Sequence, residues 1–284
     1  MADMEKDPLS GKETTGHEWD GLKELNTPLP KWWLYTLYAT ILWAIGYWII
    51  YPAWPSLTDY TKGVLGYSSR AELAETMDRV RDSRSAWMAR FETTAVGDIK
   101  KDAELFTYAA AGGRAIFADN CAPCHAAGGS GGAGYPSLAD DDWIWGGDID
   151  SIYTTIRFGA RGNHDDTRTS DMPAFGTDEI LDEQDIAAVA DHVLSLTGGP
   201  ANGQGERVYA DQCAACHGEA GTGNMDLGAP NLADAIWLYG DSRDAVIAQV
   251  AAPKHGVMPA WEGRIDPVSL KQVAIYVHSL GGGQ

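Results

Sequence analysis

The sequence predicts a mainly α-helical protein in which one N-terminal transmembrane helix precedes two tandem domains of the same design. Two observations predict this fold class. Residues 32–51 form an apolar run without a charged residue, which as a helix would span roughly 30 Å, the thickness of a bilayer core. Further along, residues 113–121 match residues 205–213 at a constant offset of 92 positions. This offset indicates an internal duplication.

The apolar run carries aromatic residues at both ends, as helices do where they meet the two faces of a bilayer. These are Trp32, Trp33 and Tyr35 at one end and Trp48, Tyr51 and Trp54 at the other. A buried helix of a soluble core and a cleaved signal peptide are the alternatives. The run is longer than the apolar part of a signal peptide, begins some thirty residues into the chain, and is not followed by a small-residue cleavage site. We expect residues 32–54 to be retained as an anchor in the lipid bilayer.

All four cysteines lie in two Cys-x-x-Cys-His motifs. In such a motif two thiols can add to the vinyl groups of haem, and the adjoining histidine can bind the iron. A redox dithiol, a structural disulfide and half of a zinc site also use Cys-x-x-Cys. A dithiol does not need the histidine, however, and zinc would need two more close ligands in each half. The motifs therefore predict two covalently bound haem c groups, held by Cys121, Cys124 and His125 and by Cys213, Cys216 and His217.

Two methionines are candidates for the sixth iron ligand. Met172 and Met258 each begin a Met-Pro-Ala-aromatic sequence, and a thioether ligand raises the reduction potential and closes the iron to other ligands. A single methionine is more often core filler, but the repeated context favours ligation. Met225 has no counterpart in the first repeat and is expected to be a loop residue. His164 and His255 lie within eight positions of a candidate methionine and are either rival iron ligands or solvated loop residues.

Each repeat thus predicts a helix, the haem motif, a glycine-rich loop, a methionine loop and a closing amphipathic helix, the last over 182–196 and 267–280. This order resembles the class I cytochrome c domain over about residues 108–198 and 202–283. The resemblance makes the expected architecture one transmembrane helix followed by two tandem class I cytochrome c domains.

The same resemblance implies two sets of contacts. In that family a glycine and an aromatic residue of the first helix pack against the last helix, and the glycine permits a close approach. The backbone carbonyl of a proline accepts a hydrogen bond from the proximal histidine and orients its ring. The corresponding residues are Gly113 with Phe117, Gly205 with Tyr209, and Pro136 and Pro230.

The N-terminal segment sharpens the resemblance. Residues 16–33 contain Trp-Asp-Gly-Leu-Lys-Glu-Leu and precede one span and two haem domains. Over nearly the whole chain this resembles the membrane-anchored dihaem cytochrome c subunit of cbb3-type cytochrome c oxidases. The resemblance implies one-electron transfer from a soluble or membrane cytochrome c donor to a catalytic subunit with haem b and a haem–copper centre, which reduces oxygen to water. A monohaem cytochrome c subunit is a further implied partner, and this chain itself is expected to carry no catalytic residue.

Two other functions are alternatives. A free-standing anchored dihaem carrier could serve another reductase or dehydrogenase, although the N-terminal segment argues against it. A dihaem peroxidase would need one iron open to peroxide, so two methionine ligands would exclude it.

The expected organisation follows the chain, with residues 1–31 as a polar, extended cytoplasmic segment and 32–54 as the anchor. A periplasmic helical linker, 55–107, precedes the cytochrome c domains, 108–200 and 201–284. More lysines precede the span than follow it, which places the N-terminus in the cytoplasm. Haem c attachment outside the cytoplasmic membrane, an expectation from the cytochrome family, places the domains in the periplasm of a bacterial inner membrane protein.

The net charge of −19, from 40 acidic and 21 basic residues, argues against nucleic-acid binding, which depends on Lys and Arg at phosphates. Residues 108–200 contain fifteen acids and four bases, a net charge of −11, whereas 201–284 contain nine and five, a net of −4. The acidic first repeat could dock a basic electron donor or could serve solubility alone.

Residues 69–93 predict a helix with one apolar stripe. The stripe consists of Leu73, Met77, Val80, Trp87 and Phe91. It must be buried against either the chain's own haem domains or a partner subunit, and both alternatives stay open from the sequence.

Overall fold

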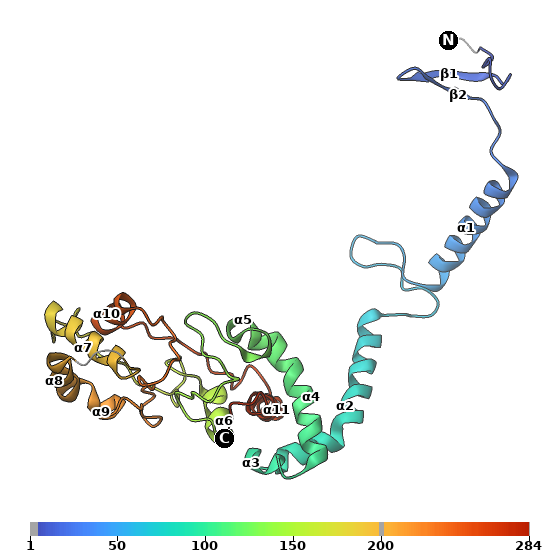
Figure 1. Ribbon diagram of the computed structural model, residues 1–284. Coiled ribbons are helices and arrows are strands. Elements are labelled where there is room, and N and C mark those ends of the chain that lie inside the picture. The colour runs from blue at the N-terminus through green and yellow to red at the C-terminus, as the bar shows by residue number, and fades with distance from the viewer. Residues whose placement is uncertain (1–4, 199–201, 284) are drawn as a thin grey trace. The chain divides into compact units, whose positions relative to one another are not determined.

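The computed structural model describes residues 5–198 and 202–283. The chain forms two compact units, Met1–Ser83 and Arg84–Gln284, whose elements are labelled in Figure 1. The first unit holds a β-hairpin and the apolar helix, and the second holds both haem motifs.

The N-terminal segment was expected to be extended, but it contains a β-hairpin. Strands β1 (Thr14–Trp19) and β2 (Leu22–Leu25) pair antiparallel. Between them Asp20 and Gly21 both have positive φ, +51° and +86°, which is the conformation of a two-residue hairpin turn. The Asp-Gly dipeptide was therefore the sequence signal that could have found this hairpin.

Helix α1 (Lys31–Ile50) forms over nearly the predicted residues and is long and apolar enough to cross a membrane. It begins directly after Pro30. Proline is tolerated at the start of a helix because the N–H that it lacks would have no partner within the helix there. None of its side chains is buried within the protein, as expected where lipid rather than protein surrounds a helix. The helix is thus a candidate membrane span.

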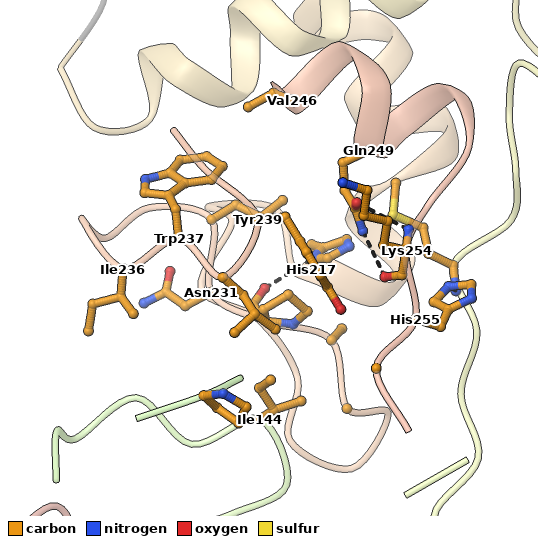
Figure 2. A pocket seen from close by; sticks show the side chains of 18 of the residues that line it. Ile144, His217, Asn231, Ile236, Trp237, Tyr239, Val246, Gln249, Lys254 and His255 are labelled. Carbon is orange, nitrogen blue, oxygen red and sulfur yellow. Dashed lines mark hydrogen bonds between the residues drawn. The ribbon is translucent and has the colours of Figure 1, made fainter. Parts of the chain in front are cut away.

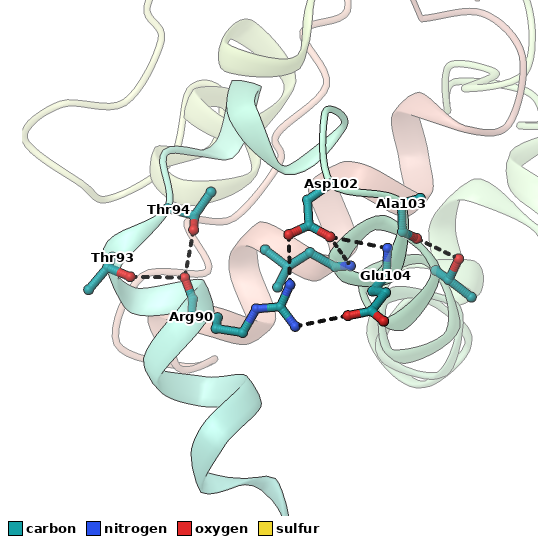
Figure 3. Close-up of polar contacts among 8 residues, drawn as sticks. Arg90, Thr93, Thr94, Asp102, Ala103 and Glu104 are labelled. Carbon is teal, nitrogen blue, oxygen red and sulfur yellow. Dashed lines mark hydrogen bonds and ion pairs between the residues drawn. The ribbon is translucent and has the colours of Figure 1, made fainter.

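Helix α2 (Ser69–Thr93) has the predicted bounds, and its residues 84–93 belong to the second unit. There Phe91 is fully buried and the Trp87 ring stacks on Tyr108 with centroids 4.8 Å apart. Arg90 also pairs with Asp102 at 2.7 Å and with Glu104 at 3.4 Å, as Figure 3 shows. This end of the stripe packs on the chain's own haem unit.

The other end of the stripe is exposed. Leu73, Met77 and Val80 have 61%, 51% and 37% of their surface accessible. These three residues belong to the first unit, and for them both alternatives stay open.

The second unit is built from short helices that follow the order of the two repeats. The first repeat and its approach contain α3 (Val96–Ile99), α4 (Ala103–Asn120), α5 (Ala122–His125), the 3₁₀ turn η1 (Ala127–Gly129), α6 (Ile149–Phe158) and α7 (Glu183–Ser195). The second contains α8 (Gly203–Gln212), α9 (Ala214–His217), α10 (Arg243–Ala251) and α11 (Pro267–His278). The predicted closing helices are confirmed as α7 and α11, and Asp182 and Asp266 cap their N-termini through side-chain hydrogen bonds.

The closing helices are exchanged between the repeats. Helix α4 of the first repeat packs on α11 of the second, and α8 of the second packs on α7 of the first, as Figure 1 shows. Phe117 lies 5.3 Å from Tyr276 and Tyr209 lies 5.1 Å from His192, measured between ring centroids. The expectation that each repeat closes on its own last helix is therefore wrong, although the predicted aromatic residues do make the contact.

The glycines of α4 and α8 lie where these helices cross. A Cβ added to Gly113 would meet the Gln272 carbonyl oxygen at 2.1 Å, and one added to Gly205 would meet that of Ala188 at 2.0 Å. Real Cβ atoms are not found this close to a carbonyl oxygen, so only glycine lets the helix backbones approach so closely. The close approach implied by the resemblance is present, but with the partner helix of the other repeat.

The hydrophobic core of the second unit has two clusters of matching composition. One joins α4, α6 and α11 with α3 and the end of α2, and the other joins α7, α8 and α10. Helices α6 and α10 stay with the haem motif of their own repeat. The exchange therefore begins after α6 and α10 and carries each methionine loop and closing helix to the other motif.

Replacing Gly205 with Ala should destabilise the protein by about 2–3 kcal/mol, because the new methyl group would force α8 away from the α7 backbone. Gly203→Ala is the matched control on the same helix, since a Cβ there meets nothing within 4 Å, and it should be neutral or slightly stabilising. Urea unfolding followed by circular dichroism measures both. Equal stability of the two variants would contradict the close helix crossing.

Candidate haem-binding sites

Each Cys-x-x-Cys-His motif forms one helical turn. The His125 N–H donates to the Cys121 carbonyl at 2.9 Å, and the His217 N–H donates to the Cys213 carbonyl at the same distance. Positions three and four apart on a helix lie on one face. Both thiols and the imidazole of each motif are therefore presented on the same side of the turn.

The proximal histidines are oriented by the two predicted prolines. Nδ1 of His125 lies 3.0 Å from the Pro136 carbonyl oxygen, and Nδ1 of His217 lies 3.0 Å from that of Pro230. A carbonyl only accepts, so each Nδ1 carries the proton and each Nε2 is left free. Such a contact fixes the tautomer and the ring orientation of a metal-binding histidine.

A cavity of about 400 Å³ lies beside the second motif. Cys213, Cys216 and His217 line it together with Met172 of the first repeat. Much of its wall is apolar or aromatic, and Figure 2 shows Ile144, Ile236, Trp237, Tyr239 and Val246 around His217. The structure thus brings the first candidate methionine to the second haem motif.

The first motif has the reciprocal arrangement. Cys121 and Ala122 pack against the core cluster of α4, α6 and α11, and Met258 and Trp261 of the second repeat pack against the same cluster. Each motif therefore shares its core cluster with the methionine of the other repeat, and the second motif also shares the cavity with Met172.

The chain segments cross at a backbone bridge. The Ala160 N–H donates to the Met258 carbonyl at 3.0 Å, and the Met258 N–H donates to the Ala160 carbonyl at 2.9 Å. Gly159 precedes the bridge with φ +73°, and a Cβ there would lie 2.4 Å from the Met258 carbonyl oxygen. Glycine is required at this position by both its conformation and its close contact.

Of the three rival residues, His255 lines the cavity, whereas Met225 and His164 are not among its lining residues. Met225 is a loop residue, 44% exposed. The Nδ1 atom of His164 accepts a hydrogen bond from the Asp166 N–H, and its Nε2 lies 3.1 Å from Glu262. Nε2 of His255 accepts a hydrogen bond from the Met172 N–H at 3.1 Å. Both histidines are thus engaged in hydrogen bonds that join one repeat to the other.

Three family models match consecutive parts of the chain. Residues 11–58 match the N-terminal domain of cytochrome oxidase-cbb3, FixP. Residues 110–197 match the cytochrome c family, and residues 200–277 match cytochrome c oxidase, cbb3-type, subunit III. The three matches follow one another along the chain in the order of its anchor and two repeats.

Full-length relatives share about half of the sequence. The cbb3-type cytochrome c oxidase subunit FixP of Bradyrhizobium diazoefficiens is 51% identical over 99% of this chain and 98% of its own length. FixPc of Rhizobium leguminosarum is 51% identical and CcoP of Azospirillum brasilense 48% identical, each over the full length of both chains. The chain belongs to the FixP/CcoP family of cbb3-type cytochrome c oxidase subunits. It is therefore an electron-transfer subunit of such an oxidase, and a free-standing carrier is not favoured.

The electrostatics of the sites suit the chemistry of a FixP/CcoP subunit. Burial, with a smaller effect from the neighbouring thiol, raises the pKa of Cys121 and of Cys213 to about 11, so both thiols are neutral at physiological pH. Burial also lowers the pKa of His217, against the opposing effect of its bond to Pro230. The neutral imidazole that an iron ligand requires is thus favoured.

The residues present fit haem c, as expected for the two cytochrome c domains of the family. Each site offers two thiols, an oriented imidazole with a free Nε2, and a thioether, which is the donor set of haem c. The buried Nε of Arg168 has no hydrogen-bond partner among the described residues, and Arg161 lines the cavity. Guanidinium groups such as these are well suited to carboxylates like the haem propionates.

The exchange is the feature that sequence reasoning missed. The two closing helices share apolar residues at several aligned buried positions, and the two motifs share the preceding glycine. They differ where buried Ile275 of α11 aligns with Asp191 of α7, which pairs with Arg243 of α10. The shared pattern predicted both closing helices without indicating which motif each one covers.

Asp142, on the wall of the cavity, gives the unit a measurable pH dependence. Burial and then the nearby Asp234, Asp140 and Asp141 raise its pKa to about 6. The pKa of Asp142 in the folded protein lies above its ordinary value of 3.8. The stability that protonated Asp142 contributes is therefore fully present below pH 3.8 and is lost as the pH rises through about 6. Asp142→Asn should therefore gain thermal stability relative to the parent between pH 5 and 7.5.

The expected gain in melting temperature is about 2–4 °C, or roughly 1 kcal/mol once solvent screening of a half-exposed group is allowed for. Asp226→Asn, at an exposed loop residue, is the control and should show the same difference from the parent at both pH values. A pH-independent difference for Asp142→Asn would contradict the raised pKa.

Proposed function

We propose that the chain carries two covalent haem c groups. One is attached to Cys121 and Cys124, with His125 and Met258 as iron ligands. The other is attached to Cys213 and Cys216, with His217 and Met172 as iron ligands. The observation that carries this proposal is the pair of motifs with proline-oriented histidines, each of which shares a core cluster with one methionine.

A bound haem c iron supplies one-electron chemistry by changing between its ferric and ferrous states. The protein's residues set the conditions for that change. The carbonyls of Pro136 and Pro230 hold the imidazoles in one tautomer and make them better iron ligands. The methionine sulfurs would serve as the sixth ligands and would raise the reduction potential of each iron, and the apolar residues of the cavity wall would pack against the haem.

We infer that electrons enter from a soluble or membrane cytochrome c donor in the periplasm and leave toward the catalytic haem–copper subunit. A monohaem cytochrome c subunit is the further partner. Membership of the FixP/CcoP family supports assembly with a catalytic subunit, and the resemblance supports the remaining partners. The chain itself contributes electron transfer, while oxygen is reduced to water by the oxidase as a whole.

The proposed topology is a single-pass protein of the bacterial inner membrane. Residues 1–31 lie in the cytoplasm, 32–54 form the anchor, and the linker 55–107 and the repeats 108–200 and 201–284 lie in the periplasm. The lysines before the span and the periplasmic attachment of haem c support this orientation. A dihaem peroxidase fits less well, because both proposed irons have a methionine ligand.

The test is purification of the complex in mild detergent through a tag on this chain. We expect two haem c per chain, copurifying b-type haem and copper, and oxygen consumption driven by reduced cytochrome c. The control is a chain in which Cys213 and Cys216 are replaced by Ser, which should retain one haem c. A dihaem chain that reproducibly purifies without b-type haem, copper or oxygen uptake, after loss during extraction is excluded, would contradict the proposal.

A further inference from the structure

We propose that His255 is a positioning residue for Met172, the sixth ligand proposed above for the iron held by His217. The inference rests on that proposed ligand set and adds a residue to it. His255 belongs to the second repeat and Met172 to the first, so the contact between them exists only because the methionine loops are exchanged.

The loop that carries Met172 has little backbone support of its own. Among the described residues, none of the backbone N–H groups of residues 169–174 donates to another backbone group. Pro173 has no N–H to donate. The loop's position therefore depends on side chains that reach it from other elements.

His255 provides the contact nearest the ligand. The Met172 N–H donates to Nε2 of His255 at 3.1 Å, and the imidazole is largely covered, with 31% of its side chain exposed. Nδ1 then carries the proton and faces the Asp171 carboxylate at 3.8 Å. The imidazole thus fixes the backbone of the residue whose sulfur must reach the iron.

His255 is itself held by both neighbours in sequence. Gln249 of α10 makes two hydrogen bonds of 3.1 Å with the backbone of Lys254, one to its carbonyl and one from its N–H. The Nε of Arg161 donates to the Gly256 carbonyl at 2.7 Å, and its Nη1 donates to the Ser170 carbonyl at 3.2 Å. Figure 2 shows Gln249 beside Lys254, with His255 at the edge of the cavity.

The other methionine is positioned differently. Met258 makes two backbone hydrogen bonds with Ala160, so its place is set by main chain. His164, the histidine of the first repeat that lies near a methionine in sequence, contacts Glu262 rather than a methionine N–H. Glu262 is also paired with Arg157. Loss of a histidine should therefore weaken ligation of the His217 iron but not of the His125 iron.

The test compares His255→Leu, His255→Gln and His164→Leu in the purified full-length chain. Leu removes the acceptor, whereas the Gln side chain can return an amide oxygen to the position of Nε2. His164→Leu is the matched control, because it removes a histidine that contacts Glu262 rather than a methionine N–H. The readouts are the charge-transfer band of methionine-ligated ferric haem, carbon monoxide binding to the ferrous chain, and the two waves of a redox titration.

We expect His255→Leu to weaken methionine binding at one haem by about tenfold, the effect of leaving a backbone donor unpaired. That haem should bind carbon monoxide and its wave should move to lower potential. His255→Gln should restore the parent behaviour, and His164→Leu should leave this haem unchanged. All three variants should keep two haems per chain.

The affected wave is identified by Met172→His, which exchanges the proposed ligand itself. Unchanged potential, band and carbon monoxide binding in His255→Leu would overturn the inference if Met172→His does move a wave. Equal damage from Leu and Gln at 255 would also overturn it. If Met172→His moves neither wave, the proposed ligand set fails and the positioning role fails with it.

Discussion

The two backbone hydrogen bonds between Ala160 and Met258 hold the crossing on which the haem unit depends. Beyond this point the methionine loop and closing helix of each repeat pack beside the haem motif of the other repeat. The bridge needs Gly159 beside it, where both φ and the contact with the Met258 carbonyl exclude a side chain. Gly113 and Gly205 then allow the exchanged helices to pack backbone against backbone.

The crossing makes the two repeats one folding unit. Each core cluster takes two helices from one repeat and one from the other, so neither repeat can bury its apolar residues alone. Each proposed iron likewise depends on both repeats for its ligands. Further contacts across the crossing, such as Arg157 with Glu262 and Arg161 with Gly256, join the two methionine loops. In an electron-transfer subunit, these shared contacts hold the two haem sites in fixed positions relative to each other.

Much of this follows from the sequence because local chemistry decides it. The motifs and the approximate bounds of α2 and of the two closing helices depend on short-range patterns and were predicted from them, whereas the hydrogen bonds of Pro136 and Pro230 were implied by the family resemblance. The exchange depends on which of two similar helices meets Gly113 or Gly205, and the apolar pattern that they share does not indicate that choice. The hairpin at Asp20 and Gly21 had a local signal, but the polar composition around it concealed the strands.

The exchange is tested most directly by cutting the chain between the repeats. A protease site placed at residues 199–201 of the full-length, haem-loaded protein would be cleaved on native membranes, which are then washed. We expect the second fragment to stay bound to the membrane-anchored first fragment and both haems to keep methionine ligation. Release of the second fragment as a soluble, methionine-ligated haem protein would contradict the exchange.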